Sequence, residues 1–547
     1  MLNVTKKAGV AAVLAGTMAL GTVFAVPVGA GGGAENKQWD RPGPMSPVLH
    51  PGSVKGAGMV QTPLDSIDGA IGQSIADRTF PGAVVFVARN GHVVKHEAYG
   101  HSALYTDDRF TEMDEPVAMT EETIFDLASI SKIFTTTAAM KLYEQGLFSL
   151  DDPVADYIPE FADNGKEEVT IRQLMTHTSG FTAWVPLYSQ GKSREDRLDI
   201  AHRYPLANPP GTKYTYSDLN MITLGSLVER LSGKRLDQFI QDEITGPLGM
   251  KDTMYNPPAS LKNRIAATEY QPALGRGIVW GSVHDENAWS LDGVAGHAGV
   301  FSTAPDLAKF AHMFLNDGRY GGKRILKLET VRLLEENQIP GFPGNDHGLG
   351  WELNQGWYMD ALADSGTAGH TGYTGTSIAV SKKNQTIAIL LTNRVHPSRN
   401  TISLNTIRRT VARQVADAIP APLPKHEEMW FSGYGDRLDR TLEFELDGAA
   451  TELSFDSWHR LENRSDYGRV EVSADGVNWT ELAALTGNGG DLERVTADLP
   501  EGTEFVRFRY DTDASVNGRG WYVGNVMADG ESVEPAGDTD GWALRDY

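Results

Sequence analysis

The chain has 547 residues, no cysteine and a formal net charge of −23. The lack of cysteine excludes a disulfide-stabilised fold, thiol catalysis and cysteine-ligated metal centres, and the acidic balance argues against a nucleic-acid partner. Hydrophobic residues make up 40% of the chain, enough for a large core and for about three domains, or one large and one small domain.

The N-terminus has the pattern of an export signal. Lys6 and Lys7 precede an apolar run from about residue 8 to residue 26, and small residues follow it. This order predicts a cleaved signal peptide over residues 1–30 and a secreted, extracytoplasmic protein. The alternative is a single membrane anchor, because the run is about as long as the shortest spanning helices. Residues 31–61 are rich in glycine and proline and are expected to form an irregular arm.

Residues 62–419 alternate between patterns typical of strands and of helices. Thr62 is a good N-cap and Pro63 suits a first helical position, so a helix is predicted to start there. Further helices are predicted over 131–146, 220–232, 304–316 and 401–419, and strand hairpins over 83–89 with 92–99 and over 376–381 with 386–392. Strands at both ends with helices between them predict an α+β domain with an antiparallel sheet, in which the first and last strands meet.

A proline-rich linker at residues 420–426 precedes a compositionally distinct module at 427–547. This module holds 27 acidic residues against ten arginines and no lysine. Short alternating runs at 442–446, 452–455, 470–473, 505–510 and 520–526 are separated by turn residues. That pattern predicts an all-β sandwich.

The first chemical motif is Ser129-Ile130-Ser131-Lys132. Residues three apart on a helix share a face, so Lys132 is expected to reach the Ser129 hydroxyl. A serine hydroxyl becomes a nucleophile when a neighbouring group takes its proton. Ser131 has the wrong phase for that face and is expected to pack.

Two later motifs support a catalytic role for Ser129 and Lys132. Tyr216-Ser217-Asp218 precedes a helix, and His370-Thr371-Gly372 precedes a strand. With these three ordered motifs, residues 62–419 resemble the serine β-lactamase/penicillin-binding-protein superfamily, which uses Ser-x-x-Lys, Tyr-x-Asn and Lys-Thr-Gly. Flanking segments at 80–85, 174–180 and 209–212 reinforce the resemblance.

The resemblance implies a role for each residue of the first two motifs. Ser129 would be the nucleophile, and Lys132 its proton acceptor or shuttle. Tyr216 would be a general base or acid whose phenol pKa is lowered by Lys132. Asp218, which replaces the usual Asn, would position Lys132 and the substrate.

The third motif is implied to bind substrate. Backbone N–H groups of Ser129 and Tyr373 would form the oxyanion hole, and Thr371 and Gly372 would contact substrate, with Gly372 allowing a close approach. His370 occupies the position of the usual Lys. A histidine is neutral or only partly charged near pH 7, so this departure favours peptidase, amidase or esterase activity over efficient β-lactam hydrolysis.

Two further segments point to one subfamily within this superfamily. Residues 283–288 and 293–303 look like a subfamily linked to peptidoglycan recycling, which includes exo-acting N-acetylmuramoyl-L-alanine amidases. The run His284-Asp285-Glu286 is expected to order a loop rather than bind a metal, and no metal or cofactor is predicted for this domain. His297 either lines the cleft and contacts substrate or packs in its loop.

Other side chains carry weaker signals. His177 is expected to be a buried structural histidine. Trp184, Trp280 and Trp289 either stack on sugar rings or pack in the core or rim.

The C-terminal module resembles the jelly-roll module of secreted metallopeptidases of the immune inhibitor A type, through segments at 458–462, 467–473, 507–510 and 515–522. No His-Glu-x-x-His motif is present. The carboxylates of Asp466, Asp511 and Asp513 form either a Ca²⁺ site or a solvated acidic surface. Contact with cell-wall glycan is inferred only by analogy.

Together these patterns predict a secreted serine hydrolase that works through a Ser129 acyl-enzyme. The expected substrate is an amide bond of a cell-wall muropeptide, at the lactyl–L-alanine amide or at a D-Ala terminus. An esterase or weak β-lactamase with the same site is the second enzyme hypothesis. The hypothesis of another class is a non-catalytic penicillin- or wall-binding protein.

Overall fold

The computed structural model describes the backbone of residues 24–27 and all of residues 45–424, 427–446 and 449–547. The predicted signal peptide and the start of the predicted arm therefore lie almost entirely outside the described residues. The chain divides into two compact units: residues 33–425 with 515–519 and 547, and residues 1–32 with 426–514 and 520–546. A membrane-spanning helix is absent from the described part of the chain.

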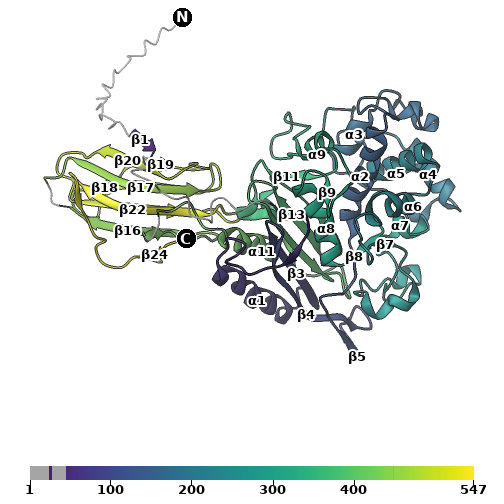
Figure 1. The fold of residues 1–547 in the computed structure, drawn as a ribbon, viewed down its shortest axis with the longest axis horizontal. Helices are drawn as coiled ribbons and strands as arrows, with labels where there is room; N and C mark the ends of the chain where they lie inside the picture. The colour runs from purple at the N-terminus through teal and green to yellow at the C-terminus, as the bar shows by residue number, and fades with distance from the viewer. Residues whose placement is uncertain (1–23, 28–44, 425–426, 447–448) are drawn as a thin grey trace, which may run out of the picture. The chain divides into compact units, whose positions relative to one another are not determined.

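The larger unit is built around a mainly antiparallel sheet (Figure 1). Its strand order is β11-β12-β13-β14-β3-β4-β2, with β5 beside β4. The strands are β2 (His50–Pro51), β3 (Gly82–Arg89), β4 (His92–Tyr105), β5 (Glu112–Ala118), β11 (Glu352–Leu353), β12 (Thr367–Gly372), β13 (Thr376–Ser381) and β14 (Thr386–Thr392). β14 pairs with β3, so the predicted meeting of the first and last hairpins is confirmed. Only β2 runs parallel to its neighbour, β4.

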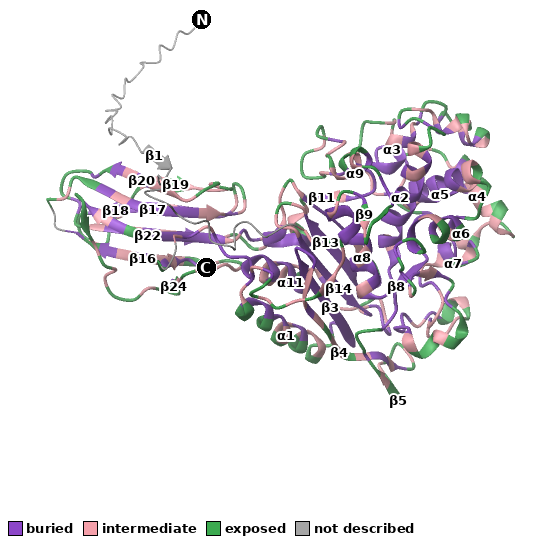
Figure 2. Cartoon of the chain, viewed as in Figure 1, coloured by how far each residue is buried: buried purple, intermediate pink, exposed green. Residues whose placement is uncertain are grey.

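Both faces of this sheet are covered by helices. Every residue of β3 is buried, as Figure 2 shows for the central strands, which explains its unbroken hydrophobic run. One core cluster joins Val85 of β3 to α1 (Gln61–Ala76) and α11 (Asn405–Asp417). Another joins Phe86 to α2 (Ser131–Glu144) and α8 (Ala304–Leu315). The sheet thus supports α2, whose first turn follows Ser129.

A helical subdomain completes the larger unit. Its helices are α3 (Ile171–Met175), α4 (Arg194–Arg203), α5 (Asp218–Ser232), α6 (Leu236–Ile240), α7 (Glu286–Ser290) and α9 (Leu328–Glu335). The short helix α10 (Gly356–Met359) instead packs against α11 in the core cluster that includes Val85. Small sheets pair β6 (Phe125–Asp126) and β7 (Met254–Tyr255) with β8 (Val300–Ser302), and β9 (Arg319–Tyr320) with β10 (Lys323–Arg324).

Three predicted helix starts were wrong, and one of them is α5, which begins at Asp218 instead of residue 220. α1 begins at Gln61 with Val60 as its N-cap, and the Val60 N–H donates to the carbonyl of Ala418 at 2.8 Å. Thr62 therefore lies inside the helix and does not cap it. α11 begins at Asn405 instead of Thr401, and the non-helical residues Thr401, Ser403 and Leu404 line a cleft.

The smaller unit is an all-β sandwich, as predicted. One sheet has the order β1-β20-β17-β22-β15-β24 with β23 beside β22, and the other the order β16-β21-β18-β19. The strands are β1 (Phe24–Pro27), β15 (Met429–Phe431), β16 (Asp439–Glu445), β17 (Glu452–Arg460), β18 (Tyr467–Ser473), β19 (Thr480–Leu485), β20 (Glu493–Asp498), β21 (Phe505–Asp511), β22 (Gly520–Ala528), β23 (Glu531–Ser532) and β24 (Ala543–Arg545). Phe508 of one sheet packs on Phe455 and Trp521 of the other. Its jelly-roll type stays a prediction.

Lys166 is a fully buried cation in the helical subdomain. Its ammonium donates to the carbonyl of Asp163 at 2.6 Å and lies 5.2 Å from the centroid of the Phe161 ring. Burial lowers the pKa of Lys166 to about 8, and the charge of Asp163 only partly opposes this effect. The charged lysine therefore destabilises the folded state below pH 8, and the penalty disappears as the pH rises toward the ordinary lysine value.

Replacing Lys166 by methionine is expected to raise the free energy of unfolding by about 1–3 kcal/mol at pH 7, with a smaller gain at pH 10. Urea unfolding at both pH values measures this difference, with the exposed Lys192→Met as the matched control. A loss of stability at pH 7 would contradict the prediction.

Candidate active site

Ser129 lies in a tight turn that leads directly into α2. A 3-10 turn spans Ala128–Ile130, and Ala128 has a φ of +47°, a strained value for a residue other than glycine. The buried carboxylate of Asp126 accepts hydrogen bonds from the N–H of Ala128 at 2.9 Å and from the N–H of His284 at 2.6 Å. Asp126 thus holds the turn that carries Ser129 and connects it to the loop that contains His284, a role that the sequence did not predict.

Replacing Asp126 by alanine is expected to cost about 2–5 kcal/mol of stability and to lower kcat at least roughly tenfold, because two buried N–H groups lose their acceptor and the Ala128 turn relaxes. Thermal unfolding and steady-state kinetics measure the two effects. Asp107→Ala is the matched control, since the half-buried Asp107 also accepts two backbone N–H groups. Unchanged kcat in the Asp126 variant would contradict a positioning role.

Lys132 is brought to Ser129 as the motif spacing predicted. Its ammonium, which is fully buried, donates to Ser129 Oγ at 2.9 Å, forms an ion pair with Asp218 Oδ1 at 2.9 Å, and donates to the carbonyl of His297 at 3.3 Å. Burial alone would lower the pKa of Lys132, but the Asp218 carboxylate and the neighbouring Tyr216 raise it above the ordinary value. Lys132 is therefore an ammonium at rest and cannot accept a proton in that state.

Tyr216 packs over this ammonium at the start of α5. The centroid of its ring lies 4.7 Å from Lys132 Nζ and 4.6 Å from the ring of His177. Burial raises the pKa of Tyr216 more than the Lys132 charge lowers it, so the predicted decrease was wrong. The phenol is neutral at physiological pH.

His177 supports Tyr216 from behind. Its Nδ1 accepts from the N–H of Ser217 and lies 3.1 Å from the side-chain amide nitrogen of Asn220. Burial lowers the pKa of His177 well below the ordinary value. The ring is thus a neutral structural group, in agreement with the expectation from sequence.

The third motif lies on β12, beside the nucleophile's turn. His370 Nδ1 is 2.8 Å from the carbonyl of Thr371, and burial lowers the pKa of His370 to about 3, so the ring is neutral. Its ring centroid lies 6.0 Å from that of Tyr216, and it lines neither hollow described below. A Cβ on Gly372 would lie 2.3 Å from the carbonyl oxygen of Leu127. The missing side chain of Gly372 therefore lets the turn that carries Ser129 pack against β12, in addition to the predicted close approach of a substrate. Thr371 is half-buried and faces the cleft.

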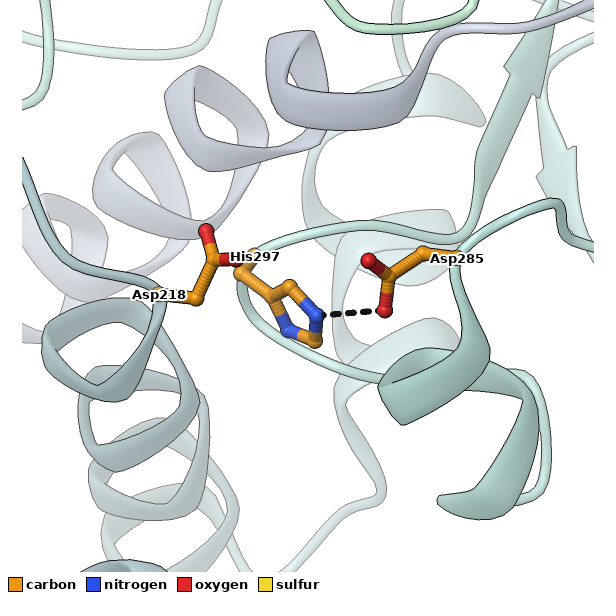
Figure 3. Close-up of side chains that lie close together, drawn as sticks. All are labelled: Asp218, Asp285 and His297. Carbon is orange, nitrogen blue, oxygen red and sulfur yellow. Dashed lines mark hydrogen bonds and ion pairs between the residues drawn. The ribbon is translucent and has the colours of Figure 1, made fainter. Parts of the chain in front are cut away.

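The loop before β8 adds a second layer of acidic and histidine side chains. Figure 3 shows the His297 ring between Asp218 and Asp285, with His297 Nε2 at 2.8 Å from Asp285 Oδ1. Asp285 also caps α7, because it accepts the N–H of Ala288 at 2.7 Å. The three side chains offer ligand atoms within 4.8 Å of one another, but Asp218 is paired with Lys132 and Asp285 with His297. These partners support the predicted loop-ordering role of Asp285.

Ion pairs and hydrogen bonds also join the residues on either side of Asp285, His284 and Glu286, to Glu269 and Arg399. His284 Nε2 lies 2.9 Å from Glu269, whose pKa is about 2 because bonds from His284 and Arg399 outweigh the effect of burial. Arg399 also contacts Glu286.

Of the three tryptophans, Trp184 and Trp289 are exposed, whereas the indole of Trp280 donates to the carbonyl of Ile265. Ser131 Oγ accepts the N–H of Val300 at 3.0 Å, a packing role as predicted.

Two hollows open on either side of Ser129, Tyr216 and Tyr373. The first has a volume of about 570 Å³ and is lined by Glu352, Arg394 and Arg408. The second has a volume of about 370 Å³, and its wall includes Trp184, Asp218, His284, Asp285, Glu286 and Arg399. His297 lines the second hollow but is only 1% exposed, so packing dominates over contact with a substrate. Tyr373, 53% exposed, forms the rim between the two hollows.

In the smaller unit, the predicted carboxylate group is only partly assembled. Asp466 and Asp513 lie with Glu462 so that their oxygens are within 4.8 Å of one another. Asp511 instead forms an ion pair with Arg469 at 2.7 Å. Ca²⁺ binding there stays a prediction.

Comparison with known proteins matches the span that carries the three motifs. The family model described as beta-lactamase matches residues 67–413. A protein named "Putative D-alanyl-D-alanine carboxypeptidase" from Escherichia coli (strain K12) is 34% identical over 383 residues, which are 64% of this chain and 86% of that protein. A protein of the same name from Salmonella agona (strain SL483) is 33% identical over 383 residues, 64% of this chain and 87% of its own.

Solved structures agree at the level of the fold. The structure titled "EstCE1, a hydrolase with promiscuous acyltransferase activity" superposes with a TM-score of 0.52 at 23% identity, covering 65% of this chain and 99% of that one. A class C beta lactamase gives a TM-score of 0.51 at 21% identity, covering 65% and 97%.

Proposed function

Because the chain belongs to the β-lactamase family of serine hydrolases, we propose that it hydrolyses the terminal D-Ala peptide bond of cell-wall muropeptides through an acyl-enzyme on Ser129. The observation that carries the proposal is the 2.9 Å contact of Lys132 Nζ with Ser129 Oγ, at the edge of a hollow lined by two arginines. The name of the Escherichia coli relative supports the same substrate class.

The protonation states favour a relay through Tyr216. Ser129 Oγ attacks the carbonyl carbon and passes its proton to the Tyr216 oxygen, while the phenol proton moves to the departing nitrogen as the C–N bond breaks. Lys132 keeps its charge and stabilises the negative charge that develops on these oxygens. In the second half, water attacks the ester carbon and gives its proton to the Tyr216 oxygen, the phenol proton returns to Ser129, and the C–Oγ bond breaks.

The first hollow is suited to the anionic end of such a substrate. Arg394 and Arg408 both line it, and the Arg408 guanidinium is held in place by hydrogen bonds to the carbonyls of Gly372 and Thr376, both at 2.9 Å. An arginine fixed in this way binds a carboxylate without a large ordering cost. These arginines provide the positive charge that the neutral His370 does not supply at the third motif.

A second candidate is cleavage at the lactyl–L-alanine amide. The second hollow favours it, because the 45% exposed indole of Trp184 lies at its wall and offers a flat face to a sugar ring. An esterase or weak β-lactamase, and a binder that forms a long-lived acyl adduct without turnover, remain outcomes of the test below.

Product analysis by mass spectrometry separates these functions. Wild-type protein and Ser129→Ala are incubated with a muramoyl pentapeptide ending in D-Ala-D-Ala and with N-acetylmuramoyl tripeptide. Free D-Ala from the first substrate, by the wild type only, supports the proposal. Free N-acetylmuramic acid from the second supports the amidase instead. If the protein hydrolyses only nitrophenyl esters or β-lactams, both the D-Ala peptidase and the amidase hypotheses would be contradicted.

We also propose that the protein is exported and that its β-sandwich contacts the cell wall. The basic and apolar N-terminal pattern supports export. N-terminal sequencing of protein from the culture medium tests this, and cosedimentation of the purified full chain with peptidoglycan sacculi tests wall contact. Retention in the cytoplasm, or no cosedimentation, would contradict the respective proposal.

A further inference from the structure

Glu352 is a carboxyl group in the first hollow that the proposed reaction does not use. It lies on the edge strand β11, paired with Gly369 of β12. Its buried Oε2 atom lies near the Tyr358 hydroxyl, but no contact among the described residues meets the geometry of a hydrogen bond to it. A carboxyl oxygen in that state is available to interact with a substrate group or to carry a proton.

The groups that face Glu352 are cationic or neutral. The cationic groups are Arg408 of α11, Lys132 of α2 and Arg394, which lines the same hollow. The neutral groups are Tyr358 of α10 and Tyr214 and Tyr216 before α5. His347 forms an isolated backbone bridge with Glu352. His347 is neutral, because burial lowers its pKa to about 4. Glu352 is therefore the acidic group that faces the two arginines across this hollow.

The charge of Glu352 changes near neutral pH. Burial raises its pKa to about 7, although the Tyr358 hydroxyl and the charges of Arg408 and Lys132 oppose this effect. Below that pH the neutral carboxyl leaves the positive charges of Arg394 and Arg408 unopposed. Above it, a carboxylate stands in the same space and repels an anionic substrate group.

We propose that Glu352 is a specificity-determining residue that sets the net charge of the first hollow and so decides how well a substrate's terminal carboxylate is accepted. The inference rests on the proposed function, because it needs an acyl substrate that reacts at Ser129. It goes beyond that function by assigning the pH dependence of substrate selection to one side chain.

The expected signature is a KM effect confined to anionic substrates. Between pH 6 and pH 8.5, the KM of a carboxylate substrate is expected to rise about five- to tenfold relative to that of its neutral analogue, as the Glu352 charge appears. The KM of the neutral analogue should not follow this change, and kcat for both should share one pH profile.

The test uses two depsipeptides with the same acyl group, whose leaving groups end in a free carboxylate or in a carboxamide. KM is measured for both from pH 6 to pH 8.5 with the full-length wild type, Glu352→Gln and Glu336→Gln. Glu336 is an exposed glutamate after α9 and serves as the matched control. In Glu352→Gln the KM ratio should stay low and flat, whereas the control should follow the wild type.

Four results would separate the possible failures. A KM ratio that does not change with pH in the wild type overturns the inference without any variant, so misfolding of Glu352→Gln cannot rescue it. A Glu352→Gln ratio that still rises with pH also overturns it, and equal loss on both substrates shows a merely structural role. Turnover of neither depsipeptide by the wild type contradicts the proposed function itself.

Discussion

Replacing Ser129 by alanine is expected to lower kcat/KM by a factor on the order of 10⁴–10⁶, with little change in stability. The reason is that Oγ is the atom proposed to form the covalent intermediate, and the Lys132–Asp218 ion pair remains intact beside the lost hydroxyl. Steady-state hydrolysis of the depsipeptide pair, with thermal unfolding of the same samples, measures both effects.

The control for this variant is Ser66→Ala on the exposed face of α1, which should retain wild-type activity. Residual activity of Ser129→Ala above about one-hundredth of the wild-type value would contradict a Ser129 nucleophile, because catalysis by the remaining groups does not approach that level.

Replacing Lys132 by alanine is expected to have the second-largest effect. The variant loses the ammonium that stabilises the developing charge at Ser129, and it leaves Asp218 without its counterion. We expect kcat to fall by about 10³ or more and stability to fall by about 3–5 kcal/mol, since one partner of a buried ion pair is removed. Kinetics and urea unfolding measure the two losses separately.

Lys141→Ala on the same helix is the matched control, because Lys141 is only partly buried and pairs with Glu243 at 3.2 Å at the other end of α2. Its stability loss should stay within about 1 kcal/mol. The double variant Lys132→Met with Asp218→Leu should recover stability but not activity, whereas recovery of activity would show that the ammonium is not needed for the chemistry.

Local sequence patterns correctly predicted the features that depend on residues close together in the chain. The strand patterns over 83–89 and 92–99 predicted the hairpin of β3 and β4, and the Ser-x-x-Lys spacing predicted the contact of Lys132 with Ser129. The resemblance of the three ordered motifs to the β-lactamase/penicillin-binding-protein superfamily is confirmed by the family match and by the α+β fold.

Features that depend on distant contacts were missed. Asp126 had no signal beyond standing three residues before Ser129, and its role appears only when His284, 158 residues later, donates to it. Glu352 and Arg408 come from an edge strand and a distant helix, so no spacing in the sequence joins them to Ser129. The direction of the Tyr216 pKa shift was wrong because burial, which the sequence does not reveal, outweighs the charge of Lys132.

A covalent acyl intermediate on Ser129 is tested most directly by mass spectrometry of the intact protein after rapid acid quenching with the carboxylate depsipeptide. We expect a transient mass increase equal to the acyl group, mapped to the peptide that holds Ser129 and absent from Ser129→Ala. Product formation with no adduct on Ser129 at any quench time, or an adduct that also forms on Ser129→Ala, would contradict it.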